Sequence, residues 1–420
     1  MMAFDTVPAA VLVRTRWALV LGNFAIGCGL QVAAGTLHDL SRTLRVSFAA
    51  AGQLISIAAI VVCVGAPLAA WLARGRDMRK LLALALLWYA VGHAACAAAT
   101  DYLPLVVLRA LSMLAAALFT PQAAAAIAVM SPPQQRGSAI AFIFIGWSAS
   151  AVLGAPVSSY LGDALGWRHA FGLVAFVALV AATVLWISMP SGVRTPTVSA
   201  TTWKAALRDP ALMTVVLVTA LQGAGQFTVL SYFLPFCKEV LQASTGEVSV
   251  AYLWFGALGV VGNLLLVRWV GRLGPVRAVN MILGAIAASL ALWPLAGSVP
   301  ALLIVIAPWA MACFASNSAQ QARLGHLAPQ LAPALMAMNT SAIYLGQALG
   351  AAGGGALLAS HGMGALGWAG LGWMLAALAL SMYAGRKEKT QRLRGAALCV
   401  GAGMVGTGAS RASSRNADQH

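Results

Sequence analysis

Charged residues are scarce in this sequence: only 9% of its 420 residues are Asp, Glu, Lys or Arg, while 61% are hydrophobic. A water-soluble domain has roughly a quarter charged residues, so the scarcity excludes that class. It predicts a protein that crosses a lipid bilayer several times. The net charge of +16 comes from short basic clusters between apolar runs and forms no continuous basic face. Nucleic acid is therefore not an expected partner, whereas the bilayer is.

The sequence also lacks the motifs of common catalytic and cofactor sites. It has no glycine-rich nucleotide-binding loop, no nucleophile elbow and no His-x-x-x-His metal pair. We therefore expect no enzyme activity, no cofactor, no bound metal and no transport driven by ATP. The cysteines are not spaced as a metal site or redox pair. We interpret them as packing residues: Cys28, Cys63, Cys96, Cys237, Cys313 and Cys399.

Apolar runs of about 20 residues, the length that crosses a bilayer as a helix, occur twelve times. Their approximate bounds are 17–37, 48–72, 80–99, 104–129, 138–161, 170–189, 211–235, 249–270, 276–297, 300–321, 334–358 and 364–384. We predict an all-α membrane protein with 12 transmembrane helices in two six-helix halves. The predicted parts are an N-terminus (1–16), an N-terminal bundle (17–189), a linker (190–210), a C-terminal bundle (211–384) and a disordered tail (385–420).

Lysines and arginines fall mostly in alternate connections, and cytoplasmic loops are the ones that carry such an excess. If both termini lie on one side, that side collects Arg14, Arg16, Arg74, Arg76, Arg79, Lys80, Arg136, Arg194, Lys204, Arg208, Arg268, Arg272, Arg277, Arg323 and the cluster at 386–394. The other side has only Arg42, Arg45, Arg168 and Lys238. We therefore predict a multi-pass protein of the inner (plasma) membrane with termini, linker and tail in the cytoplasm.

The two halves repeat each other. Pro133-Gln134 and Pro329-Gln330 are 196 residues apart and precede equivalent spans, and Gly154 and Gly350 have the same separation. Each of these two spans has a small residue at every fourth position, which allows a neighbouring helix to approach closely in lipid. The stripes are Gly146, Ser150, Gly154, Ser158, Gly162 and Ala342, Gly346, Gly350, Gly354. Internal repeats of this kind are typical of secondary transporters.

Several stretches together resemble the major facilitator superfamily over about residues 15–385, and in particular its twelve-span drug and sugar efflux branch of the arabinose-efflux and chloramphenicol-resistance type. They are "LGNFAIGCGLQVAAG", "VGAPLAAWLARGRDMRKLL", "LVVLRALSMLAAALFTPQ", "SPPQQRGSAIAF", "VLGAPVSSYLGDALGWRHAF" and "FGALGVVGNLLLVRWVGRLGPVR". The resemblance implies the major facilitator fold, a small-molecule substrate, alternating access, proton antiport and a monomer.

The resemblance also implies residues that take part in the conformational change. Gly154 and Pro156 take the Gly-x-Pro positions of the fifth-span antiporter motif, and Gly350 is the counterpart of Gly154. Such a stripe would let helices of the two halves pack closely and rock. Arg76 and Arg79 belong to the basic loop after the second span, where the only acid is Asp77, displaced from its usual place.

Proton coupling lacks an obvious carrier. None of the ten Asp and Glu residues falls near the centre of a span, and Leu30 stands where this branch often has a glutamate. The deep ionisable candidate is Arg109, in the LxxxR context of the family. It could order water or bind an anionic group, or its side chain could extend to the membrane surface. His93 is interpreted as a packed neutral histidine.

Uncharged amides are better placed to bind a solute, because the resemblance puts the first, fourth, seventh and tenth helices around the cavity. The candidates on these helices are Asn23, Gln31, Gln122, Gln222, Gln226 and Asn317, and Asn339 in the eleventh span is a further one. The alternative for each is an interhelical hydrogen bond. The sequence thus predicts efflux of a small polar or amphipathic solute, a drug or a sugar. A facilitator without proton coupling and a membrane sensor or scaffold that has lost transport are the alternatives.

Overall fold

The computed structural model describes residues 8–46, 48–73, 75–195 and 199–388, and every regular element in these ranges is helical. The first half contains α1 (Ala9–Gly35), α2 (Leu37–Thr43), α3 (Phe48–Leu72), α4 (Met78–Ala98), α5 (Tyr102–Met130), η1 (Pro133–Gln135), α6 (Arg136–Ile143), α7 (Ile145–Leu165) and α8 (Trp167–Ser188). Arg74, Pro196, Cys399 and the rest of the predicted tail from residue 389 lie outside the described residues.

The second half begins after α9 (Ala200–Arg208), a helix within the predicted linker whose N-terminus is capped by Ser199 and Thr202. Its elements are α10 (Pro210–Leu230), α11 (Phe233–Pro235), η2 (Phe236–Val240), α12 (Thr245–Leu273), α13 (Pro275–Ala291), η3 (Trp293–Leu295), α14 (Val299–Leu327), η4 (Pro329–Leu331) and α15 (Ala332–His361). A last helix spans Gly364–Glu388.

Within the described ranges, eleven helical stretches are long and apolar enough to cross a membrane, and the shorter apolar helix α13 takes the place of the ninth predicted span. The predicted all-α fold with twelve spans is thus confirmed. The helices extend beyond the predicted spans: α1 begins at Ala9, and the last helix continues to Glu388. The predicted fifth span is divided by a break at Phe144 into α6 and α7.

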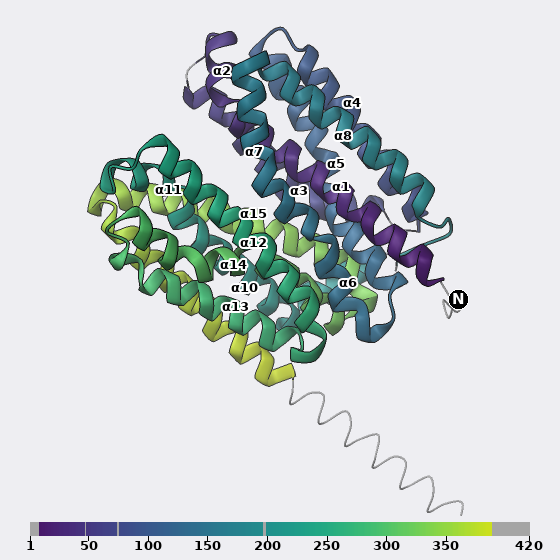
Figure 1. Cartoon of the computed structure of the whole chain (residues 1–420). Helices are drawn as coiled ribbons and strands as arrows, with labels where there is room; N and C mark the ends of the chain where they lie inside the picture. Colours follow the sequence, from purple (N-terminus) through teal and green to yellow (C-terminus); the bar gives the residue numbers. More distant parts are fainter. Residues whose placement is uncertain (1–7, 47, 74, 196–198, 389–420) are drawn as a thin grey trace, which may run out of the picture.

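The helices form two halves that lie side by side (Figure 1), and each half has a hydrophobic core of its own. One core is built from α1 to α8 and the other from α10 to the last helix, with only a few residues, such as Met336 and Ala141, joining the core of the opposite half. The start of α1 and the end of the last helix lie at the same end of the molecule, which we call the termini end. The elements named α2 and α11 lie at the opposite end.

The two halves meet toward the termini end and diverge toward α2 and α11 (Figure 1). Across the interface α3 contacts α15, α6 contacts α12 and α14, and α7 contacts α12. Polar contacts also cross the interface. Ser341 on α15 donates from Oγ to the carbonyl of Cys63 on α3, and Cys63 donates from Sγ to the carbonyl of Ser341 at 3.6 Å. Asn263 on α12 donates from Nδ2 to the carbonyl of Ala141 at 3.3 Å. This conformer is therefore closed at the termini end.

The small-residue stripes pack within each half, which corrects the expectation that they join the two halves. A Cβ on Gly146 would overlap the carbonyl oxygen of Val20, and one on Gly154 would lie 3.4 Å from Cα of Cys28, so this stripe faces α1. The stripe on α15 faces α10 in the same way. Pro156 is exposed and lies inside α7 without ending the helix. Close backbone approach thus builds the pairs α1–α7 and α10–α15.

We expect Gly350→Ala to destabilise the protein. Its Cβ would overlap the carbonyl oxygen of Ala224 and lie 2.9 Å from the amide nitrogen of Thr228, so α10 would have to move, at a cost of about 1–3 kcal/mol. The matched control is Gly353→Ala on the same helix, because a Cβ there meets nothing within 4 Å. Thermal unfolding in detergent measures both, and equal midpoints would contradict the packing described.

The predicted orientation is tested by cysteine labelling in a cysteine-free background. Arg76 is exposed in the loop between α3 and α4, whereas Thr100 is exposed between α4 and α5, at opposite ends of α4. We expect Arg76→Cys to react with a membrane-impermeant maleimide only after cells are permeabilised, and Thr100→Cys to react in intact cells. The reverse pattern would show that the termini are outside.

Candidate functional site

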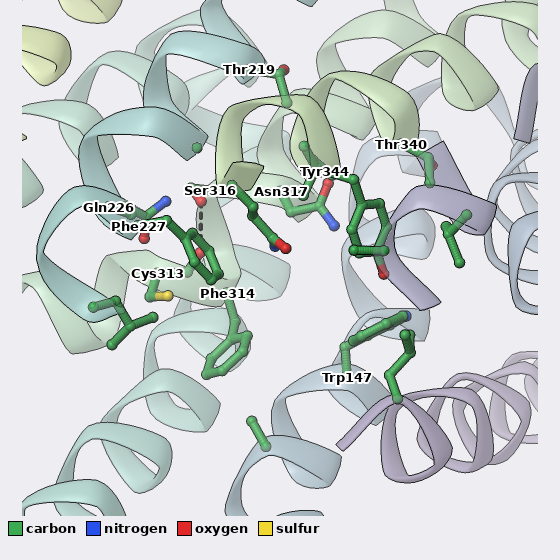
Figure 2. A pocket seen from close by; sticks show the side chains of 18 of the residues that line it. Trp147, Thr219, Gln226, Phe227, Cys313, Phe314, Ser316, Asn317, Thr340 and Tyr344 are labelled. Carbon is green, nitrogen blue, oxygen red and sulfur yellow. Dashed lines mark hydrogen bonds between the residues drawn. The ribbon is translucent and has the colours of Figure 1, made fainter. Parts of the chain in front are cut away.

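A cavity of about 360 Å³ lies between the two halves. Of the described residues that line it, none is Asp, Glu, Lys, Arg or His. Figure 2 shows Gln226 and Phe227 on one side of this cavity and Trp147 and Tyr344 on another. The polar lining consists of Gln31, Thr120, Thr219, Gln222, Gln226, Ser316, Asn317, Thr340, Tyr344 and Gln347. The cavity is therefore large enough for a small organic solute and carries no formal charge.

Four of the predicted binding residues line this cavity: Gln31, Gln222, Gln226 and Asn317. The aromatic part of the lining was not predicted from the sequence, and it comprises Phe144, Trp147, Phe227, Phe255, Phe314 and Tyr344. One signal was available, since Tyr344 precedes Gln347 by three positions on one helix and so lies on the same face. Amides and aromatic rings together suit a solute with both polar and apolar parts.

Asn23 and Asn339 are buried and hold neighbouring helices together, as the interhelical alternative predicted. Asn23 donates from Nδ2 to the carbonyl of Ile143 at 2.9 Å and accepts from the hydroxyl of Thr120 at 3.0 Å. The Ile143 carbonyl belongs to the last residue of α6, next to the helix break at Phe144. In the other half, Asn339 accepts from Thr219 at 2.6 Å and donates to Asn317 at 3.3 Å. In this conformer neither asparagine lines the cavity.

Gln122 is fully buried in α5 and does not line the cavity. Neither of its polar side-chain atoms has a hydrogen-bond partner among the described residues, and the same is true of Gln320 and Gln321 on α14. Unpaired buried amides are costly, and the structure gives no contact that explains them.

Arg109 is also fully buried outside the cavity, and its side chain does not extend to the membrane surface. It donates from Nη1 to the carbonyl of Gly29 at 2.6 Å and from Nη2 to that of Leu30 at 3.2 Å. Both carbonyls belong to α1, one and two residues before the cavity residue Gln31. Arg109 therefore fixes the part of α1 that borders the cavity instead of contacting a solute there.

His93 lies between two groups that determine its protonation. Its Nδ1 is 2.9 Å from the carbonyl oxygen of Tyr89, and its Nε2 is 3.2 Å from Nη1 of Arg109. A carbonyl only accepts and a guanidinium only donates, so Nδ1 carries the hydrogen and Nε2 accepts. This arrangement is the neutral packed histidine that the sequence predicted.

The basic loop after α3 is attached to the segment that follows α8. Asp77 caps α4 by accepting from the backbone N–H of Lys80 at 3.3 Å, and it also accepts from the N–H of Gly192. The guanidinium of Arg79 lies 4.5 Å from the ring centre of Trp186 on α8, and Arg76 is exposed. The displaced acid thus has a structural partner at the termini end.

Sequence reasoning missed a buried ion pair. Arg323, on α14, donates from Nη2 to Glu388 at 2.7 Å and from Nη1 to the hydroxyl of Ser381 at 2.9 Å. Both acceptors belong to the last helix. Arg323 was counted only as a loop charge because the sequence does not show that α14 continues to Leu327.

Two packed helical bundles that span the membrane, in contact at one end, with an uncharged cavity between them, define the class of secondary transporters. The model of the Major Facilitator Superfamily matches residues 19–351. The chain belongs to this superfamily, and it is a multi-pass membrane transporter and not an enzyme.

The inner membrane transport protein YdhP of Escherichia coli (strain K12) is 30% identical over 365 residues, which cover 86% of this chain and 93% of that protein. The chloramphenicol resistance protein of Streptomyces lividans is 31% identical over 344 residues, covering 80% and 86%. Two solved structures share the fold. The human organic anion transporter MFSD10 (TETRAN) matches with a TM-score of 0.75 at 17% identity, over 89% of this chain and 100% of that one.

The MFS proton:xylose symporter XylE, bound to 6-bromo-6-deoxy-D-glucose, matches with a TM-score of 0.71 at 16% identity, over 89% of this chain and 96% of that one. At such identities the two structures show the shared fold alone.

We expect Arg109→Lys to destabilise the protein because a lysine ammonium cannot reproduce the forked contacts to Gly29, Leu30 and His93. Loss of one or two buried charged hydrogen bonds costs about 1.5–3 kcal/mol each. The control is Arg168→Lys, since Arg168 makes one hydrogen bond, to the carbonyl of Ala99 at 2.8 Å, from a partly exposed position. Equal shifts of the thermal unfolding midpoint in the two variants would refute this role of Arg109.

Proposed function

We propose that the protein exports a small, neutral, amphipathic solute across the plasma membrane by alternating access. The observation that carries the proposal is the cavity lining, which combines amides and hydroxyls with aromatic rings and contains no described charged side chain. A buried charge without a partner is strongly unfavourable, so a cationic or anionic solute would leave its charge uncompensated here.

The proposal favours a drug-like aromatic solute over a sugar. Trp147, Phe227, Phe314 and Tyr344 offer flat apolar surfaces on several sides of the cavity, and aromatic rings pack well against one another. The relative named as a chloramphenicol resistance protein supports this choice. Because the closed end is the termini end, the conformer would face outward if both termini are cytoplasmic, as we propose.

We further propose that one chain is a complete functional unit, since its own two halves enclose the cavity and no second chain is needed to line it. The substrate would then be the small molecule, with lipid around the helices and no nucleic acid. We also propose that the protein exchanges the solute for protons.

A facilitator without proton coupling is the second candidate, and a specific observation favours it. Among the side chains that the structure describes, the buried carboxylates are Asp39 and Glu388. Asp39 accepts from Arg42 and from the backbone N–H of Trp167, and Glu388 is bound to Arg323. Both carboxylates thus have basic partners and neither lines the cavity.

Everted membrane vesicles from an expressing strain test the proposal. We expect them to accumulate radiolabelled chloramphenicol but not the permanent aromatic cation ethidium, because the cavity holds no carboxylate to balance the charge. An imposed gradient, acid inside, should raise the chloramphenicol accumulation several-fold if protons are exchanged. Equal chloramphenicol concentrations inside and outside the vesicles, with or without the proton gradient, would identify a facilitator. Chloramphenicol uptake no higher than in vesicles from an empty strain would contradict the proposed export and favour a sensor or scaffold.

A further inference from the structure

The orientation of the Gln226 amide is fixed by a group that can only donate. The indole Nε1 of Trp309 lies 3.1 Å from Oε1 of Gln226. An indole N–H has no acceptor capacity, so the bound atom must be the amide oxygen. Trp309 is fully buried and packs edge-on against Phe255 and Trp293 at ring distances of 5.5 and 6.1 Å. Gln226 therefore presents Nε2, with its two hydrogens, as the amide group that is free of a hydrogen bond within the protein.

The orientation of Gln31 on the opposite half is fixed in the other sense. Its Nε2 lies 3.4 Å from the hydroxyl of Ser150, and that hydroxyl lies 2.8 Å from the carbonyl oxygen of Trp147. A carbonyl only accepts, so the single hydrogen of Ser150 is used there. Ser150 can then only accept from Gln31. One hydrogen of the amide nitrogen is used in this way, so Gln31 presents Oε1, which is free of a hydrogen bond, together with one remaining N–H.

Two further amides on the second half, Asn317 and Gln222, also line the cavity and are held by hydrogen bonds. Asn317 accepts at Oδ1 from Asn339 at 3.3 Å, which leaves its Nδ2 as a second donor beside Gln226. Gln222 donates from Nε2 to Ser316 at 2.7 Å, but its remaining oxygen is buried and does not reach the cavity surface. Among the amides whose orientation is fixed by a hydrogen bond, Gln226 and Asn317 thus present unused N–H donors from the second half, and Gln31 presents an unused carbonyl oxygen from the first.

We propose that this fixed hydrogen-bond polarity selects the solute, and that Trp309 and Ser150 are the positioning residues that set it. The inference rests on the proposed function, in which the cavity binds a neutral solute. Such a solute carries a hydrogen-bond acceptor at the end that meets Gln226 and Asn317. It carries an N–H or O–H donor at the end that meets Gln31, with an apolar or aromatic body between the two ends.

Chloramphenicol is a suitable probe because it is neutral and has a nitro group at one end of an aromatic ring and hydroxyl donors at the other. The test compares it with two analogues, one with both hydroxyls and the amide nitrogen methylated, so that no donor remains, and one without the nitro group. Equilibrium binding to the purified full-length protein in detergent is measured for all three, so the result does not depend on transport or on proton coupling.

We expect the parent protein to bind chloramphenicol about tenfold more tightly than either analogue, as the loss of one well-placed hydrogen bond predicts. Ser150→Ala should release Gln31 and reduce only the preference over the methylated analogue, to about twofold. Trp309→Phe should release Gln226 and reduce only the preference over the analogue without the nitro group. The matched controls are Ser360→Ala and Trp254→Phe, whose side chains bond to backbone carbonyls away from the cavity.

Loss of the Trp309 ring contacts could unfold that variant, so Gln226→Leu tests the same contact without touching the tryptophan. It should also reduce only the preference over the analogue without the nitro group. Equal binding of all three compounds by the parent, or preferences that no variant changes, would overturn the polarity inference and leave the proposed function standing. Failure of the parent to bind any of the three would overturn the neutral-solute function and the inference with it.

Discussion

A bilayer interior offers no hydrogen-bond partners, and the rest of this structure depends on that constraint. Backbone groups must pair within helices, so helices persist through Pro156 and through glycines that would weaken them in water. Polar side chains must likewise find partners in neighbouring helices. Asn23 donates a hydrogen bond to the Ile143 carbonyl next to the break at Phe144, and Arg109 donates to two carbonyls of α1. The same groups that satisfy each other also fix the helices around the cavity.

The sequence alone was sufficient for the number and order of spans, the two halves and the family, because apolar length and a 196-residue repeat are properties of the chain itself. Four of the amides that the sequence singled out as binding candidates, Gln31, Gln222, Gln226 and Asn317, line the cavity in the structure. These amides sit on helices that the resemblance already placed around it.

Other features could not be predicted, because they depend on how far each helix is rotated about its axis. Asn23 and Gln31 are eight residues apart on one helix, yet the first is buried against α6 and the second borders the cavity. The stripe through Gly154 showed that some helix packs closely there, but not that the partner is α1 of the same half. The burial of Arg109 could not be predicted either. Its partners are backbone carbonyls, which every residue has and which no sequence pattern reveals.

The repeat that relates the two halves is broken at the two amides of opposite polarity. With the shared offset of 196 residues, Gln226 corresponds to Leu30, and Gln31 corresponds to Phe227. Two identical halves would present the same groups on both sides of the cavity. A solute could then bind in either of two opposite orientations with equal free energy. Because the two halves belong to one chain, their residues can differ, and the two orientations of the solute then differ in free energy. Discrimination between the two ends of a solute therefore requires that the two halves differ at these positions, as they do at Gln31 and Gln226.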